Sequence, residues 1–135
     1  FKPGISALNS RSEFFANQLM SLHIKGAYSK GSSTLFEFGK HQKENIASKE
    51  VEKSSFVFLQ KYIYLRRGTY FFTTAEYYRP NDELDTEIAR IGPGLQYFLN
   101  QVIEFRADLY NAKSYNPNSA TKDSYDFTAQ VHLWF

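Results

Sequence analysis

DSYDFTAQVHLWF, residues 123–135, alternates between apolar and mostly polar side chains without a break. Every odd-numbered position from Tyr125 onward is apolar or aromatic, whereas the even-numbered positions include Asp126, Gln130 and His132. A period of two is the pattern of a β-strand with one apolar and one polar face. At about 3.3 Å per residue, this strand is long enough to cross the hydrocarbon core of a bilayer at a tilt.

The same stretch resembles the carboxy-terminal strand of bacterial outer-membrane β-barrel proteins. Those strands end in Phe after alternating apolar positions, and the barrel-assembly machinery reads them as a signal. The resemblance covers this one strand closely and the rest of the chain only as a general pattern. It implies a bacterial outer-membrane location, contact with outer-membrane lipid and lipopolysaccharide, and Phe135 as the assembly signal.

The composition favours strands over membrane helices. The 135 residues correspond to one domain, residues 1–135, and 13 Phe and 10 Tyr supply an aromatic content of 18% that suits pleated surfaces and membrane interfaces. No window approaches twenty consecutive apolar residues, as a membrane helix requires. The absence of Cys excludes disulfides, and the net charge of +2 gives no nucleic-acid signature.

The start at Phe1-Lys2-Pro3-Gly4 predicts a processed or excised product.

Alternation elsewhere predicts seven further strands, eight in all. The expected ranges are 2–16 (irregular), 20–30, 33–42, 54–66, 69–79, 86–99, 102–113 and 123–135. A helix remains an alternative for residues 12–22, with Ser12 as its N-cap, and for residues 83–91. Gly92-Pro93-Gly94 predicts a bulge or kink, because proline removes a donor from the strand ladder.

The connections are expected to alternate between tight turns and longer polar loops. The tight turns are Gly31-Ser32, Arg67-Gly68 and Asn100-Gln101, and the longer loops are 43–53, 80–85 and 114–122. Outer-membrane barrels combine short periplasmic turns with longer extracellular loops. The predicted fold class is therefore an all-β, antiparallel up-and-down transmembrane β-barrel of about eight strands, complete or the carboxy-terminal part of a larger barrel. A partner protein or an additional chain would complete the larger form.

The expected strands place charged and titratable side chains on an inward face. This barrel interior, or pore lining, comprises His23, Lys25, Glu37, Lys61, Glu76, Arg90, Glu104, Arg106, Asp108, Asp126 and His132. Lys61 is assigned inward because a lysine facing lipid near the midplane costs roughly 2–4 kcal/mol. The expected membrane-interface aromatics, in two girdles, are Tyr28, Tyr64, Tyr70, Tyr77, Tyr97, Tyr110, Tyr125 and Trp134.

The motifs favour a protein without catalysis, cofactor or metal. The three histidines lie in separate segments without metal-ligand spacing, and no nucleophile elbow or glycine-rich phosphate loop occurs. Glu104 and Asp108 flank Arg106, which predicts a salt network rather than acid–base catalysis. The lysines from Lys40 to Lys53 are candidates for contact with lipopolysaccharide phosphates, with a solvated loop as the alternative.

The expected function is that of a porin-like passive channel, or of a membrane scaffold or binding barrel that acts through its extracellular loops. Two soluble alternatives stay open. One is a calycin-like barrel that binds a small hydrophobic ligand, with aromatic side chains inside and charges outside. The other is an α+β fold in which residues 12–22 form a helix on a curved sheet.

Overall fold

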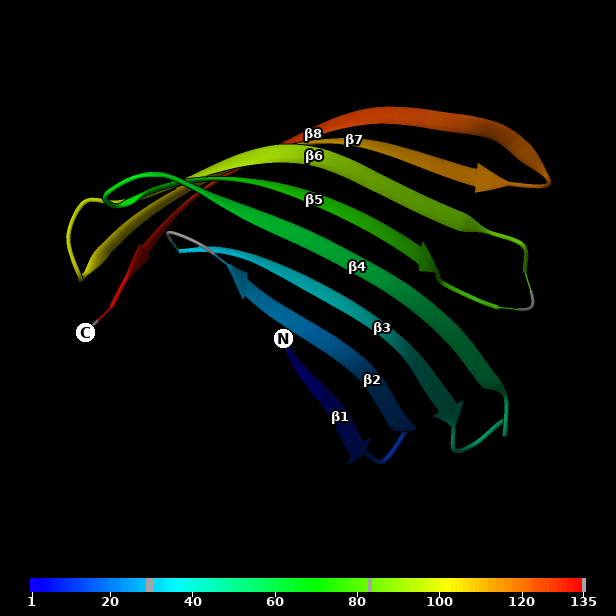
Figure 1. Cartoon of the computed structure of the whole chain (residues 1–135). Coiled ribbons are helices and arrows are strands. Elements are labelled where there is room, and N and C mark those ends of the chain that lie inside the picture. Colours follow the sequence, from blue (N-terminus) through cyan, green and yellow to red (C-terminus); the bar gives the residue numbers. More distant parts are fainter. Residues whose placement is uncertain (29–30, 83, 135) are drawn as a thin grey trace.

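The structure, a computed structural model, describes residues 1–28, 31–82 and 84–134. These residues form a single sheet of eight antiparallel strands in sequence order, which confirms the all-β, up-and-down expectation (Figure 1). The strands are β1 (Lys2–Arg11), β2 (Phe15–Tyr28), β3 (Ser32–Asn45), β4 (Val51–Arg66), β5 (Thr69–Arg79), β6 (Glu87–Phe98), β7 (Ile103–Asn116) and β8 (Ser119–Leu133). The described residues contain no helix, so the two helical alternatives are wrong.

The first hairpin shows why residues 12–22 do not form a helix. β1 ends at Arg11 and β2 begins at Phe15, so the single irregular strand expected over residues 2–16 is two strands joined by a turn. Ser12 Oγ accepts a hydrogen bond from Phe15 N at 3.1 Å, and Ser12 N donates to Phe15 O at 2.8 Å. A serine N-cap makes a similar side-chain contact with the third residue of a helix. Here the same contact lies in a hairpin turn, because Ser12 N also donates to Phe15 O across the turn.

The connections at the other end of the strands are shorter than expected. The loop predicted over residues 114–122 is wrong, because β7 continues to Asn116 and β8 starts at Ser119, which leaves a two-residue turn at 117–118. The loop predicted over 43–53 is limited to residues 46–50. In this turn Asn45 Oδ1 accepts hydrogen bonds from Ala47 N and Ser48 N. Polar side chains in these segments therefore extend the strands. Among the described residues at this end of the strands, the longest connection lies between Arg79, the end of β5, and Glu87, the start of β6.

The turns on the opposite side match the expectation in part. Arg67-Gly68 is a tight turn, with Gly68 at a φ of 73°. The predicted turn at Asn100-Gln101 is wider and covers residues 99–102, and Asn100 Oδ1 accepts hydrogen bonds from Val102 N and Ile103 N. Ser32 already belongs to β3, and the residues before Gly31, 29 and 30, lie outside the described part of the chain. The strict alternation of short and long connections is therefore lost.

The Gly92-Pro93-Gly94 motif lies inside β6 without the expected bulge. The register with β5 runs unbroken through all three residues. The pairing with β7 is interrupted at Gly92 and Pro93 and resumes in the same register, with Ile91 opposite Asn111 and Gly94 opposite Asp108. A Cβ atom on Gly92 would overlap the carbonyl oxygen of Leu109, so glycine allows β6 and β7 to approach closely. The register shifts lie instead at the ends of β4 and β7.

The sheet is curved, and one contact identifies its concave face (Figure 1). Arg106 Nη1 on β7 donates a hydrogen bond to Tyr62 OH on β4 at 3.4 Å, across the two strands between them. Such a contact is possible only on the inner side of a curved sheet. The continuous strand register then assigns every other residue of each strand to the same side.

β1 and β8 are the two edges of the sheet. Within the described residues, no Cα atom of β1 lies within 8 Å of a Cα atom of β8. The sheet is therefore open, and closure into a barrel is not observed. None of the described segments is a helix suited to spanning a membrane.

Candidate functional site on the concave face

A row of register partners across the concave face creates the room for a polar network. Tyr62, Phe72, Gly94 and Asp108 pair in turn from β4 to β7. A Cβ atom on Gly94 would overlap the ring of Phe72, so the missing side chain allows this ring to lie over β6. Phe72 is fully buried, and its ring lies 5.1 Å from the ring of Tyr62. The glycine and the aromatic residue thus form a floor on which side chains from β7 can rest.

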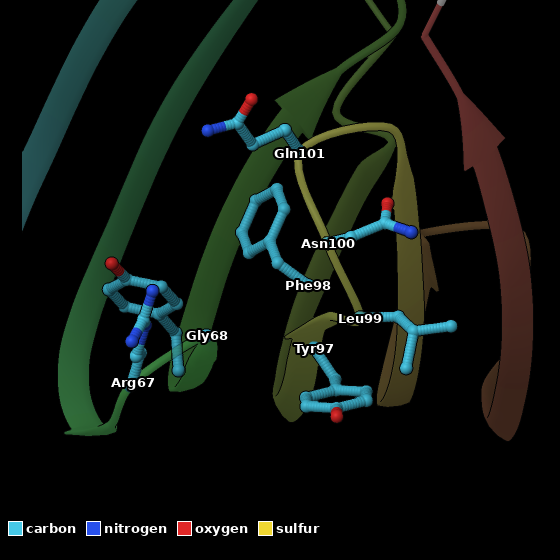
Figure 2. Close-up of a pocket in the computed structure, with 8 residues that line it drawn as sticks. Arg67, Gly68, Tyr97, Phe98, Leu99, Asn100 and Gln101 are labelled. Carbon is cyan, nitrogen blue, oxygen red and sulfur yellow. The ribbon is translucent and has the colours of Figure 1, made fainter.

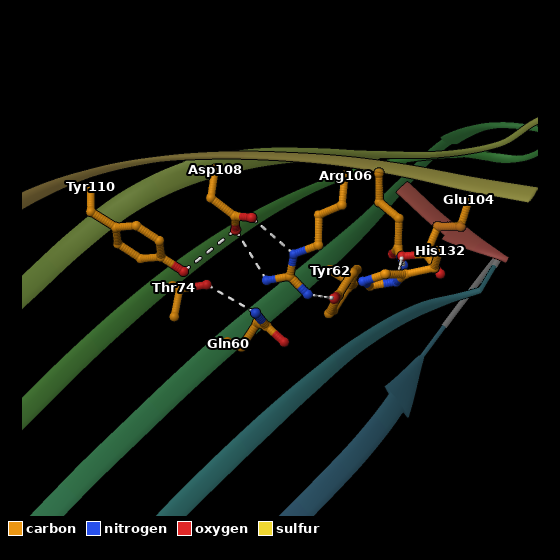
Figure 3. A network of polar contacts seen from close by, with 9 residues as sticks. Gln60, Tyr62, Thr74, Glu104, Arg106, Asp108, Tyr110 and His132 are labelled. Carbon is orange, nitrogen blue, oxygen red and sulfur yellow. Dashed lines mark hydrogen bonds and ion pairs between the residues drawn. The ribbon is translucent and has the colours of Figure 1, made fainter. Parts of the chain in front are cut away.

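Arg106 is the centre of this network (Figure 3). Its guanidinium carbon lies 4.4 Å from the centroid of the Phe72 ring, a cation–π distance. Its Nε and Nη2 atoms each donate to one oxygen of Asp108 at 3.0 Å, and Tyr110 OH lies 3.4 Å from the same carboxylate. Asp108 is 4% exposed, so this bidentate ion pair is shielded from solvent on the Asp side. Through its hydrogen bond to Tyr62 OH, Arg106 also connects β7 with β4.

Two smaller contacts extend the network along the same face. Gln60 Nε2 on β4 donates to Thr74 Oγ1 on β5 at 2.9 Å, and both residues are buried. On β7, Glu104 is also buried and accepts a hydrogen bond from Gln96 Nε2 at 2.6 Å. His132 Nδ1 lies 3.4 Å from the same Glu104 oxygen. The buried polar groups of this network are therefore paired with one another.

Most of the residues expected on one polar face share the concave face of the sheet. Ten of the eleven lie on the concave face by strand register: His23, Lys25, Glu37, Glu76, Arg90, Glu104, Arg106, Asp108, Asp126 and His132. The structure brings Arg106 to Asp108, Glu104 to His132, and Arg90 to Glu76, the last pair at 4.0 Å. The salt network predicted around Arg106 is present, although only Asp108 pairs with it directly.

Lys61 is the exception, and its predicted inward position is wrong. Lys61 pairs with Thr73, on the same side of the sheet as Leu59 and Ile63, and it is exposed. Sequence reasoning chose the parity of β4 from the cost of one charge facing lipid. The structure chooses the opposite parity because Gln60 and Tyr62, on the other face, find partners on β5 and β7.

The expected interface aromatics divide between the two faces. Tyr28, Tyr77, Tyr97 and Tyr125 lie on the convex face by register. Tyr64, Tyr70 and Tyr110 lie on the concave face, on the same side of the sheet as Arg106. Tyr64 and Tyr70 form an edge-to-face pair at 5.7 Å, and Tyr110 contacts Asp108. Trp134 follows β8 with its ring edge-on to His132, and Phe135 lies outside the described residues.

The convex face carries a continuous set of exposed apolar side chains, which we call the apolar belt. Phe127 is 71% exposed and Ile91 is 61% exposed, both on strands whose opposite face is polar. The belt comprises Ile5, Leu22, Ile24, Phe36, Phe38, Leu59, Ile63, Phe71, Ile91, Leu95, Phe105, Leu109, Phe127, Val131 and Leu133. Contiguous exposed apolar surface of this extent marks a contact with lipid or with another protein.

Comparison of this chain with protein-family models, with curated proteins and with solved structures finds no match. The site must therefore be interpreted from its own chemistry. Among the residues that the structure describes, no group of three or more His, Asp or Glu side chains could hold a metal ion.

One serine–histidine contact lies on the concave face, outside the network. Ser54 Oγ is 3.5 Å from His41 Nδ1, at the outer limit of a hydrogen bond, and Ser54 is buried. A catalytic serine needs a closer base and access for a substrate. This pair therefore resembles a structural cross-strand contact more than a nucleophile and its base.

A cavity of about 660 Å³ lies at the rim that carries the turn at Arg67-Gly68. Figure 2 shows Tyr97 and Phe98 pointing away from each other at the end of β6, with Asn100 and Gln101 on the following turn. Arg67 is its one charged lining residue. The cavity is separate from the Arg106 network and adds no titratable cluster to it.

Sequence reasoning missed the uncharged members of the network. Gln60, Tyr62, Phe72, Thr74 and Gly94 carry no charge, and four of them lie in strands whose two faces are similar in polarity. The one available signal was Gly94, because a glycine inside a strand often marks a close approach of another group. The partner of that glycine, Phe72, depends on register and is not visible in the sequence.

Proposed function

We propose that this chain forms a wall of an outer-membrane β-barrel, without catalysis, whose concave face borders a water-filled path in the manner of a porin. The observation that carries the proposal is the sidedness of the sheet, with the apolar belt on the convex face and the Arg106 network on the concave face. Transmembrane barrels have an apolar outside and a polar inside, whereas a soluble ligand-binding barrel needs the reverse. The sidedness therefore favours the membrane over the calycin-like alternative.

The dimensions of the belt support the same proposal. On β8 the alternation from Tyr125 to Leu133 matches the roughly 9–11 residues that a tilted transmembrane strand needs. Ion pairs Arg79–Glu87 and Lys113–Asp123 lie on the convex face beyond the belt, where strands would leave the hydrocarbon for the headgroups. Tyr77 OH accepts a hydrogen bond from Arg79 Nε at 2.9 Å at this level.

Among the residues that the structure describes, Lys61 is the one charge on the convex face within the belt. It pairs with Thr34, which is near the start of β3 and so close to the rim on that side. A lysine side chain can extend its ammonium group from such a position toward the headgroups. Its cost then falls from roughly 2–4 kcal/mol at the midplane to about 0–1 kcal/mol near the interface.

The short connections favour a channel wall over a binding barrel that acts through loops. The turns at 12–14, 46–50 and 117–118 are short, and among the described residues the connection between β5 and β6 offers the longest surface for a partner. The proposed partners are therefore membrane lipid, the barrel-assembly machinery through β8 and Phe135, and further strands at the two open edges. Such strands, from a partner protein or an additional chain, would satisfy edge groups that lipid cannot.

The test exploits the absence of cysteine from the chain. Phe127→Cys and Thr128→Cys introduce neighbouring thiols on opposite faces of β8, in protein folded into phospholipid vesicles. A polarity-sensitive thiol-reactive fluorophore should report an apolar environment at position 127 and an aqueous one at position 128. Heat-modifiable gel mobility should accompany folding into the vesicles. A monodisperse monomer in detergent-free buffer, or equal polarity at both positions, would contradict the proposal.

A further inference from the structure

The convex face of β1 to β4 changes from apolar to polar within three register rows, at the rim with the turns 12–14 and 46–50. The lowest row consists of Ile5, Leu22, Phe38 and Val57. The highest row consists of Asn9, Gln18, Gln42 and Lys53. The row between them places Lys40 beside Met20 and Ser55. Two lysines and three amides therefore lie directly above the apolar belt.

Lys40 and Lys53 converge on one hollow of this surface. Lys53 pairs with Gln42 and Lys40 pairs with Ser55, so the two lysines are diagonal neighbours on adjacent strands, a separation of about 7–8 Å. A cavity of about 170 Å³ lies there. Its lining residues on the convex face are Gln18, Met20, Lys40, Gln42 and Lys53, with Asp82 from the following connection; His41 and Ser54, whose side chains lie on the concave face, complete the lining.

Lys40 and Lys53 differ from Arg79 and Lys113, two other basic residues of this rim, in that they form no ion pair among the described residues. Arg79 is paired with Glu87, and Lys113 with Asp123. In the part of the chain that the structure describes, neither Lys40 nor Lys53 forms an ion pair. Asp82 is the one carboxylate lining the cavity, and its Oδ1 already accepts a hydrogen bond from Ser55 Oγ at 2.8 Å. Two cations facing one carboxylate leave the hollow positively charged.

We infer that this hollow binds the phosphate of a membrane lipid, with Lys40 and Lys53 as the cationic contacts and Gln18 and Gln42 as hydrogen-bond donors. The inference rests on the proposed function, because it places the apolar belt in the hydrocarbon and this row among the headgroups. Ammonium and amide groups donate to phosphate oxygens, while the acyl chains of the same lipid lie along the apolar row below. Basic residues close to an anionic membrane surface bind it in this way.

The experiment measures lipid retention by native mass spectrometry of protein released from vesicles into a neutral detergent. Lipid A or phosphatidylglycerol is titrated into the original protein, into K40Q/K53Q and into the charge-matched control K2Q/K25Q, whose lysines pair on the concave face. Each of Lys40 and Lys53 should contribute about fivefold to the apparent affinity. K40Q/K53Q should therefore bind either lipid about 25-fold more weakly, whereas K2Q/K25Q should match the original protein and K40R/K53R should retain most of the binding.

The outcomes separate this inference from the proposed function. Equal lipid retention by K40Q/K53Q and the original protein, both folded in vesicles, would overturn the lipid site and leave the barrel wall intact. Failure of every variant to enter vesicles would overturn both. Displacement of the lipid by millimolar inorganic phosphate would show a site for the free anion and would overturn its assignment to a lipid.

Discussion

At the scale of single residues, Gly94 shows how an absent side chain organises the concave face. Its missing Cβ leaves space for the Phe72 ring, and that ring supports the guanidinium of Arg106. Arg106 in turn reaches Asp108 and Tyr62. The polar network thus depends on a residue that has no polar side chain.

Gly94→Val should therefore destabilise the protein even though valine favours strands. The valine side chain would displace the Phe72 ring, and overpacking of this kind costs about 1–3 kcal/mol in the free energy of unfolding. Urea titration of the protein in micelles, followed by the fluorescence of Trp134, measures this loss. The control is Ala129→Val on the exposed convex face, which should change stability by less than about 0.5 kcal/mol. Equal effects of the two substitutions would contradict the packing seen at Gly94.

At the scale of elements, β4 is the strand whose two faces are hardest to distinguish. One face carries Val57, Leu59, Lys61 and Ile63, and the other carries Phe56, Phe58, Gln60 and Tyr62. Each face is largely apolar with one strongly polar residue. Its pairing with β5 settles the orientation, because Tyr62 is the partner of the buried Phe72.

Lys61→Leu should consequently raise the stability of the protein in lipid vesicles. If Lys61 faces lipid close to the interface, its removal recovers up to about 1 kcal/mol, the cost of a lysine at that depth. Urea unfolding in vesicles gives the free energies. Lys25→Leu, on the concave face, serves as the matched control and should bring no gain. No stabilisation by Lys61→Leu would indicate that β4 presents its other face to the membrane.

At the scale of the whole molecule, the open sheet determines what the chain can enclose. β1 and β8 pair only with β2 and β7, although both strands continue the sidedness of the sheet. In hydrocarbon, unpaired edge groups are costly, so such a sheet needs further strands on both sides. The curvature alone does not bring the two edges together in this chain (Figure 1).

Pairs of engineered cysteines test this separation. Ser6→Cys on β1 is combined in turn with D126C, T128C and Q130C on β8, which covers several registers. No disulfide should form within a monomer, because a disulfide requires Cα atoms about 4.4–6.8 Å apart and no Cα of β1 lies within 8 Å of β8. Ser6→Cys with Ser21→Cys is the control, since these residues are register partners. Non-reducing gels distinguish the forms, and an intramolecular β1–β8 disulfide would mean that the eight strands close.

What the sequence determined by itself is local. The alternation of polarity along one strand does not depend on its neighbours. The sequence alone therefore predicted the eight strands and the common face of residues such as Arg106 and Asp108. The same reasoning misplaced the loop at residues 114–122, because polar residues in an extended strand resemble those of a loop. It also misplaced Lys61, where both faces of the strand have similar composition.

The tertiary structure decided everything that depends on which strands lie side by side. Register set the face of β4, the contact between Gly94 and Phe72, and the separation of Tyr64, Tyr70 and Tyr110 from the convex face. It also brought Lys40 and Lys53 together above the apolar belt. The physical reason is that pairing energy and side-chain packing act between strands, whereas polarity along one strand records only its two faces. Whether the edges meet is likewise a property of the accumulated curvature of all eight strands.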